Sequence, residues 1–210
     1  MRLKKSIIFL LFIFFGPSEI KAQITNTIVV KVGEEIITII DLQNEILTDL
    51  IINNQEITQK NIDNRKSYSI KKLINKKIKR IEINKYEITN YSESDLNKYI
   101  SLISENLNTD LNGLKIIFKE NNIDFNIFLN SYKTELLWNT LIFRIYKNQT
   151  NINIVEVENE IKKIKIDANT IEIEKLKTEI TNKRKAEKLK LFSRSHMSNL
   201  ENTTPINYNE

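Results

Sequence analysis

Apolar residues between positions 27 and 39 form two short β-branched runs, a pattern typical of a β-hairpin. The runs 27–32 and 36–39 flank a turn that contains Gly33, which is the local signal for two antiparallel strands. Asp41 then stands at a position typical of a helix N-cap. The apolar residues after it recur every four positions, so a strand, a turn, a strand and a helix are expected in this order.

From residue 63 onward the apolar residues recur every three or four positions, the period of an amphipathic α-helix. This pattern predicts helices over 63–86, 92–107, 110–119, 125–147, 155–165 and 171–195. Ser92 or Ser94, Thr109 and Asp124 stand where three of these helices are expected to be capped. The residues 205–208 are expected to form a last short strand. The fold class predicted from these patterns is mainly α.

Two of the predicted helices differ from the others. Eight of the eleven residues from 136 to 146 are apolar, so the helix 125–147, with Trp138, is expected at the centre of the helical bundle. The helix 171–195 is charged, and its apolar stripe changes phase along its length. We expect that helix either to wrap around its partner or to be broken near Asn182.

The N-terminal residues 1–22 have the pattern of an export signal, with basic residues, then an apolar run over 7–15, then a polar stretch that ends at Ala22. An apolar helix of that length rises only about 14 Å, whereas the hydrocarbon core of a membrane is roughly 30 Å thick. We therefore expect export and cleavage after Ala22. A retained anchor stays open as an alternative, because Ile20 is bulkier than the usual residue at its position.

The charge of the chain is polarised. The formal net charge is +5, and without residues 1–22, which carry four basic residues and one acid, it is +2. Residues 175–194 carry eight basic residues and two acids. Since Phe192 is the only aromatic side chain among them, a solvated helix face is favoured over a nucleic-acid site.

The composition excludes several kinds of chemistry. The chain has no cysteine, three separated glycines and a single histidine, His196. Disulfides and cysteine-type zinc sites are therefore excluded, and phosphate-binding glycine loops are not expected. We expect no cofactor, no metal site and no catalytic residues.

Several segments together resemble the SurA-like periplasmic chaperones. The segments that carry the resemblance follow in the family's order: Val29–Thr38 with Asp41, Leu42 and Glu45, then 73–78 with Ile88, then 92–96, then 125–146 with Glu135, Leu136 and Trp138, and then 152–157. The similarity covers 27–162 and, more loosely, 175–208. Gly33 stands where the family usually has Asn, and both residue types accept a left-handed turn conformation.

The resemblance implies a domain organisation. Residues 23–165 would form a SurA-N-like helical chaperone domain, and 171–210 would form a helix and a strand that return to it. The C-terminal strand would then join the N-terminal hairpin in a small β-sheet. The family typically carries parvulin-type prolyl isomerase domains between these parts, whereas here 166–170 would be only a short linker. The resemblance therefore implies a chaperone core that is not an enzyme.

Three functions remain as alternatives. The resemblance favours an ATP-independent periplasmic holdase for unfolded envelope proteins, especially outer-membrane β-barrel precursors, with no nucleic-acid partner and no membrane span after cleavage. The second is a non-catalytic envelope assembly protein that docks through the basic helix 175–194, and the third is a degenerate isomerase. The aromatic residues expected to bind peptide are Tyr86, Tyr91, Phe118 and Tyr146, although an ordinary core role is the simpler expectation for each.

Overall fold

The structure is a computed structural model that describes residues 27–163 and 170–209. The expected leader 1–22 lies outside the described residues, as does most of the expected linker 166–170. The described elements are β1 (Ile28–Val32), β2 (Glu35–Thr38), α1 (Ile39–Ile52), α2 (Gln59–Lys85), α3 (Glu93–Asn106), α4 (Leu111–Glu120), α5 (Phe125–Tyr146), a 3-10 turn η1 (Lys147–Gln149), α6 (Ile154–Lys163), α7 (Thr170–Thr203) and β3 (Ile206–Tyr208).

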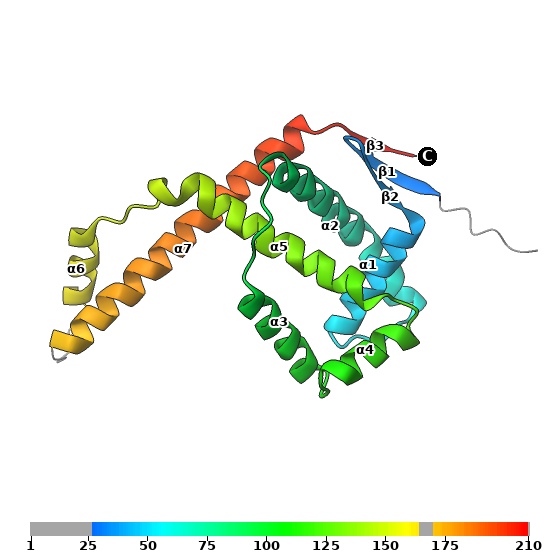
Figure 1. The fold of residues 1–210 in the computed structure, drawn as a ribbon, viewed down its shortest axis with the longest axis horizontal. Coiled ribbons are helices and arrows are strands. Elements are labelled where there is room, and N and C mark those ends of the chain that lie inside the picture. Colours follow the sequence, from blue (N-terminus) through cyan, green and yellow to red (C-terminus); the bar gives the residue numbers. More distant parts are fainter. Residues whose placement is uncertain (1–26, 164–169, 210) are drawn as a thin grey trace, which may run out of the picture.

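The two ends of the described chain meet in a small antiparallel sheet. The strand order is β2-β1-β3, so the N-terminal strand β1 is central and the C-terminal strand β3 lies beside it (Figure 1). Gly33 adopts the left-handed conformation that the turn requires, and its N–H donates to the carbonyl of Pro205 at 2.8 Å. The mainly α fold class with a small sheet from the hairpin and a C-terminal strand is confirmed.

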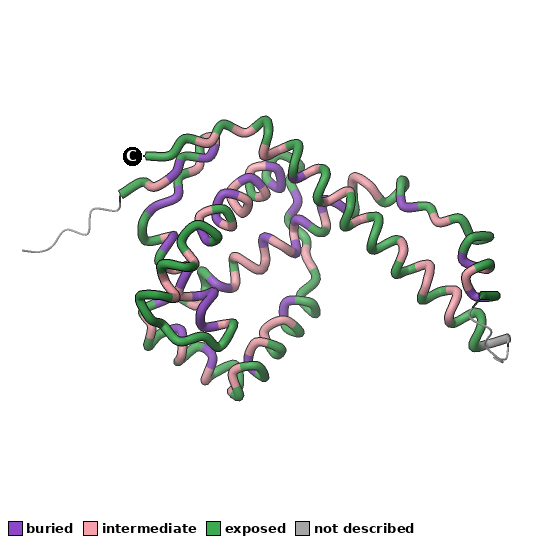
Figure 2. The backbone as a smooth tube through the Cα atoms, turned by 180° about the vertical axis from the view of Figure 1, so that it is seen from behind, coloured by how far each residue is buried: buried purple, intermediate pink, exposed green. Residues whose placement is uncertain are grey.

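The body of the molecule has two apolar clusters. The larger one joins the sheet to α1, α2, α5 and the end of α7, and it contains Trp138, Leu141 and Ile78. The smaller one joins α1, α3, α4 and the start of α5, with Phe118 and Phe128 in contact through tilted rings. Figure 2 shows that the buried positions gather in this body. α5 runs through both clusters, which agrees with its expected central place.

α7 is one continuous helix with two different partners. Its C-terminal part packs on α5 and α2, while its N-terminal part extends away from the body and packs on α6 (Figure 1). We call α6 and the N-terminal part of α7, residues 154–163 and 170–186, the arm. Of the two alternatives expected for this helix, the break near Asn182 is wrong, because α7 is continuous from Thr170 to Thr203. The apolar stripe changes phase where the partner of the helix changes.

Ion pairs hold the arm together. Glutamates of α6 pair with cations of α7: Glu158 with Lys177 at 2.7 Å, and both Glu156 and Glu160 with Arg184. Val157 and Ile161 of α6 are buried against α7. Within the described residues, no helix combines the length and the hydropathy needed to cross a membrane.

The helix caps correct two expectations. Ser92 and Asp124 are N-caps as predicted, but α1 is capped by Thr38 rather than Asp41. Thr38 accepts from the Asp41 N–H while the Asp41 carboxylate accepts from the Thr38 N–H at 2.8 Å, which is a capping box. α4 is capped by Asp110 rather than by Thr109.

Candidate functional site

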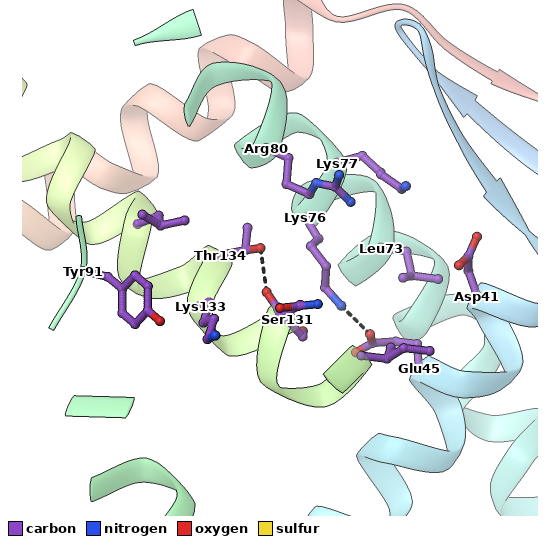
Figure 3. Close-up of a pocket in the computed structure, with 13 residues that line it drawn as sticks. Asp41, Glu45, Leu73, Lys76, Lys77, Arg80, Tyr91, Ser131, Lys133 and Thr134 are labelled. Atoms are coloured by element: carbon purple, nitrogen blue, oxygen red, sulfur yellow. Dashed lines mark hydrogen bonds and ion pairs between the residues drawn. The ribbon is translucent and has the colours of Figure 1, made fainter. Parts of the chain in front are cut away.

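A pocket of about 480 Å³ lies between α1, α2 and α5, beside the segment that leads into α3 (Figure 3). It is lined by Asp41, Glu45, Leu73, Lys76, Lys77, Arg80, Tyr91, Ile127, Asn130, Ser131, Lys133, Thr134 and Leu137. Packing of the three helices positions these side chains, because residues three and four apart on each helix share the face that turns to the pocket. We call it the central pocket.

A buried carboxylate forms one wall of the central pocket. Glu45 of α1 is buried and accepts from Lys76 at 2.7 Å and from Lys72 at 2.6 Å, and Figure 3 shows Lys76 pointing toward it. Burial alone would raise the pKa of the Glu45 carboxyl, but the ammonium groups of Lys76 and Lys72 together hold that pKa below its ordinary value. Glu45 is therefore ionised, and its negative charge is neutralised by the two lysines inside the fold.

The rim of the central pocket carries one cation that is paired with a carboxylate and two that have no carboxylate partner among the described residues. Lys77 pairs with Glu35 at 3.1 Å. Arg80 is exposed and has no carboxylate partner among the described residues. Lys133 lies over the ring of Tyr91, 5.6 Å from its centroid. The rim is therefore positive, and the walls between the cations include apolar Leu73, Ile127 and Leu137.

The arrangement suits the binding of a ligand. Apolar walls with isolated charges can accept apolar, aromatic or acidic side chains of a ligand. The described part of the chain holds no group of three or more His, Asp or Glu side chains that could bind a metal ion. No nucleophile with an adjacent base lines the central pocket, since its acidic side chains are Asp41, engaged in the α1 cap, and Glu45, engaged by lysines.

The four aromatic residues expected from the sequence lie in different places. Tyr91 lines the central pocket. Tyr86 is exposed at the C-terminal end of α2, and Tyr146 stacks on Phe192 of α7 with ring centroids 4.8 Å apart. Phe118 is fully buried in the smaller apolar cluster, so it serves the core and not an exposed binding surface.

A second polar cluster joins α2, α5 and α7. Tyr146 Oη lies 2.8 Å from Nδ1 of His196, and Nε2 of His196 lies 3.4 Å from the buried carboxylate of Glu82. Burial raises the pKa of the Tyr146 hydroxyl, with smaller contributions from Tyr86 and Glu82. The indole N–H of Trp138 donates to Ser193 at 2.8 Å nearby. These contacts fix α7 on the body.

Sequence reasoning missed most of the central pocket. Glu45 was named only among the residues that carry the family resemblance, and nothing local distinguished Arg80 or Lys133 from other surface cations. The available signal was the position of Glu45 beside Ile46 on the apolar side of α1, since an acidic residue there must find a partner.

The comparisons with known proteins include a distant structural likeness. No protein-family model and no curated protein matches this sequence. One solved structure, from work on the virulence factor PEB4 and the periplasmic protein Cj1289, described as two structurally related SurA-like chaperones of Campylobacter jejuni, is similar with a TM-score of 0.43 and 15% identity. The match covers 88% of this chain and 100% of that chain. Neither fold nor function follows from a likeness at this level.

Proposed function

We propose that this chain is an ATP-independent chaperone that holds unfolded polypeptides, among them outer-membrane β-barrel precursors, in the periplasm. The observation that carries the proposal is the central pocket, whose apolar walls and two rim cations without a carboxylate partner, Arg80 and Lys133, offer contacts to many side chains. Unfolded barrel precursors expose alternating apolar and aromatic residues. A surface of this kind can hold them through several weak contacts and release them without an energy source.

Further support comes from apolar side chains exposed on separate elements of the molecule. They include Leu102 on α3, Ile116 on α4, Phe143 on α5, Val155 on α6 and Leu191 on α7. Single exposed apolar residues are ordinary on protein surfaces. Together with the central pocket, however, they supply contact points on both the body and the arm, as binding of long unfolded chains requires.

The proposal includes the absence of isomerase activity. Only residues 164–169 separate α6 from α7, where the family resembled in sequence carries its isomerase domains. A proline-isomerisation assay on a short peptide should show no turnover above buffer. Turnover that is retained after repurification would contradict this part of the proposal.

The deciding experiment measures aggregation of an unfolded barrel precursor in the presence of the chain beginning at residue 23. Near-stoichiometric protein should slow aggregation, and Ile127→Ser, in the wall of the central pocket, should weaken this effect. Ile57→Ser is the matched control, because Ile57 is 41% exposed and Ile127 43%, and Ile57 does not line the pocket. No effect of the wild-type protein would overturn the proposal.

Export is part of the same proposal. Residues 1–22 would direct the chain out of the cytoplasm and would be cleaved after Ala22, which N-terminal sequencing of the exported protein tests. An intact leader would favour the alternative of a retained anchor.

A second candidate is an assembly protein that docks on an acidic or anionic lipid surface through α7. The observation that favours it is a set of cations left free by α6: Lys183, Lys190 and Arg194 are exposed, without carboxylate partners among the described residues, and spaced seven and four apart on one helix face. Binding to vesicles that contain anionic lipid should then weaken steeply with salt. Reversing these three charges should abolish vesicle binding and leave aggregation suppression unchanged.

A further inference from the structure

The outer edge of β3 carries backbone groups without partners. Pro205 and Asn209 each form a backbone hydrogen bond with β1 or the residues beside it, and alternate residues of an antiparallel strand direct their N–H and C=O groups to opposite sides. The N–H and C=O groups of Ile206 and Tyr208 therefore point away from β1. Among the described residues they have no hydrogen-bond partner, because β3 is the last strand of the sheet.

A hollow of about 900 Å³ lies beside this edge, between α2 and the C-terminal end of the chain. Ile70 and Ile74 of α2 line it, together with Ile206 and Tyr208 of β3. Tyr208 is 64% exposed and Tyr68, also in the lining, is 56% exposed. The free strand edge and the apolar hollow are thus formed by the same two residues of β3.

We infer that this edge binds an extended segment of polypeptide, which adds a fourth strand to the sheet. The backbone of the segment bonds to Ile206 and Tyr208, and every second side chain enters the hollow against α2. Addition of a strand to a free sheet edge gives affinity through the main chain and selects alternating apolar side chains through the pocket beneath. The inference rests on the proposed function only in taking an unfolded polypeptide as the occupant, and it assigns a site separate from the central pocket.

The chemistry of the edge favours this occupant over others. A helix cannot satisfy the free groups of β3, because its own backbone groups are already bonded. A second copy paired only here would not be held, since a stable interface buries on the order of 800 Å² per partner and β3 has only three residues. Lys71 and Glu201 in the lining have no ion-pair partner among the described residues, so a segment with an acidic side chain near Lys71 or a basic side chain near Glu201 is favoured.

The first test uses a synthetic peptide with acetylated and amidated ends, in which valine or tyrosine alternates with threonine. In one version the backbone amides of the valine and tyrosine residues carry N-methyl groups, and in the other version those of the threonine residues do. Only one version should bind, because only one set of amides faces β3. The binding version should slow hydrogen exchange of the Ile206 and Tyr208 amides. Equal binding of both versions, or protection of these amides before peptide is added, would overturn the inference.

The second test removes one edge donor and keeps the sheet. Tyr208→Pro and Tyr208→Ala both lose the ring, but only the proline variant loses the N–H that points away from β1, where proline is tolerated. Peptide affinity should be about five-fold weaker for Tyr208→Pro than for Tyr208→Ala, with equal unfolding midpoints. Equal affinities would overturn the inference. Because the wild-type aggregation assay does not depend on this comparison, failure at the edge and failure of the proposed function are distinguishable.

Discussion

Glu45 and Asp49 lie one helical turn apart on the face of α1 that packs on α2, and both carboxylates are buried. Cations of α2 neutralise them: Lys72 and Lys76 contact Glu45, and Arg65 contacts Asp49 at 2.6 Å. Burying such pairs costs desolvation energy that a well-packed apolar contact would not. Their effect is to fix which residues of α1 and α2 lie opposite each other, and this in turn places Lys76 in the central pocket.

Replacing Glu45 by Gln tests this pairing. The variant leaves two lysines beside a neutral amide, and we expect it to lower the free energy of unfolding by about 2 kcal/mol at neutral pH, less than for a fully enclosed pair because the lysines can regain water. Urea unfolding measures the change. Glu34→Gln is the control, because Glu34 pairs with Lys31 in solvent and its loss should leave the unfolding midpoint unchanged.

The same residue predicts a pH dependence. The pKa of Glu45 is lowered from 4.5 in the folded state, so its stabilisation is present above that pH and is lost as the pH falls through the folded pKa. The pKa of Lys72 is raised from 10.5. Burial acts to lower this pKa, but the charge of the Glu45 carboxylate and its hydrogen bond to Lys72, together with the charge of Asp49, outweigh burial. That stabilisation is present below 10.5 and is lost as the pH rises further. As the pH falls below 4.5, the Glu45→Gln variant should therefore lose less stability than the wild type. Equal acid loss in both proteins would show that Glu45 is not the group responsible.

At the scale of elements, the local sequence predicted where helices begin better than it predicted which elements pack against them. Ser92 and Asp124 were identifiable because a cap depends on the next few residues. The capping box of α1 was also encoded locally, by Thr38 and Asp41 three residues apart. The prediction continued the strand to residue 39 and so assigned the cap to Asp41, whereas Thr38 is both the last residue of β2 and the N-cap. The phase change in α7 could not be interpreted from sequence, because it depends on which element packs on each part of the helix.

Two neighbouring leucines of α7 test the change of partner. Leu189 is partly buried and packs against the larger apolar cluster, whereas Leu191 is 62% exposed. Leu189→Asp should lower the free energy of unfolding by about 2 kcal/mol, since it places a carboxylate against apolar atoms. Leu191→Asp should have little effect on thermal unfolding. Equal effects of the two substitutions would mean that α7 packs on the body through a different face.

At the scale of the whole molecule, contacts between distant segments form both the sheet and the central pocket. The strand pattern at each end of the chain predicted the strands themselves, and the family resemblance implied that the C-terminal strand would join the N-terminal hairpin. The central pocket was less predictable, since Leu73, Tyr91 and Ile127 come from three separate segments. Of the aromatic residues expected to bind peptide, only Tyr91 lies there. Its neighbours could not be inferred without knowing how α2 crosses α5.

The arm should behave as a unit that is separate from the body, because α7 is the main partner of α6 among the described elements. Val157 is fully buried between these two helices, so Val157→Asp should unfold α6 and leave the unfolding midpoint of the body unchanged. Hydrogen exchange measured by peptide should become fast over 154–163 and stay slow over 189–203, where α7 packs on the larger cluster. Leu141→Asp, in the body, is the contrasting variant and should destabilise every element. If Val157→Asp lowered the body's midpoint as Leu141→Asp does, the two parts would be one cooperative unit. If Val157→Asp leaves the unfolding midpoint of the body unchanged but weakens aggregation suppression, the arm contributes to client binding through its own surface.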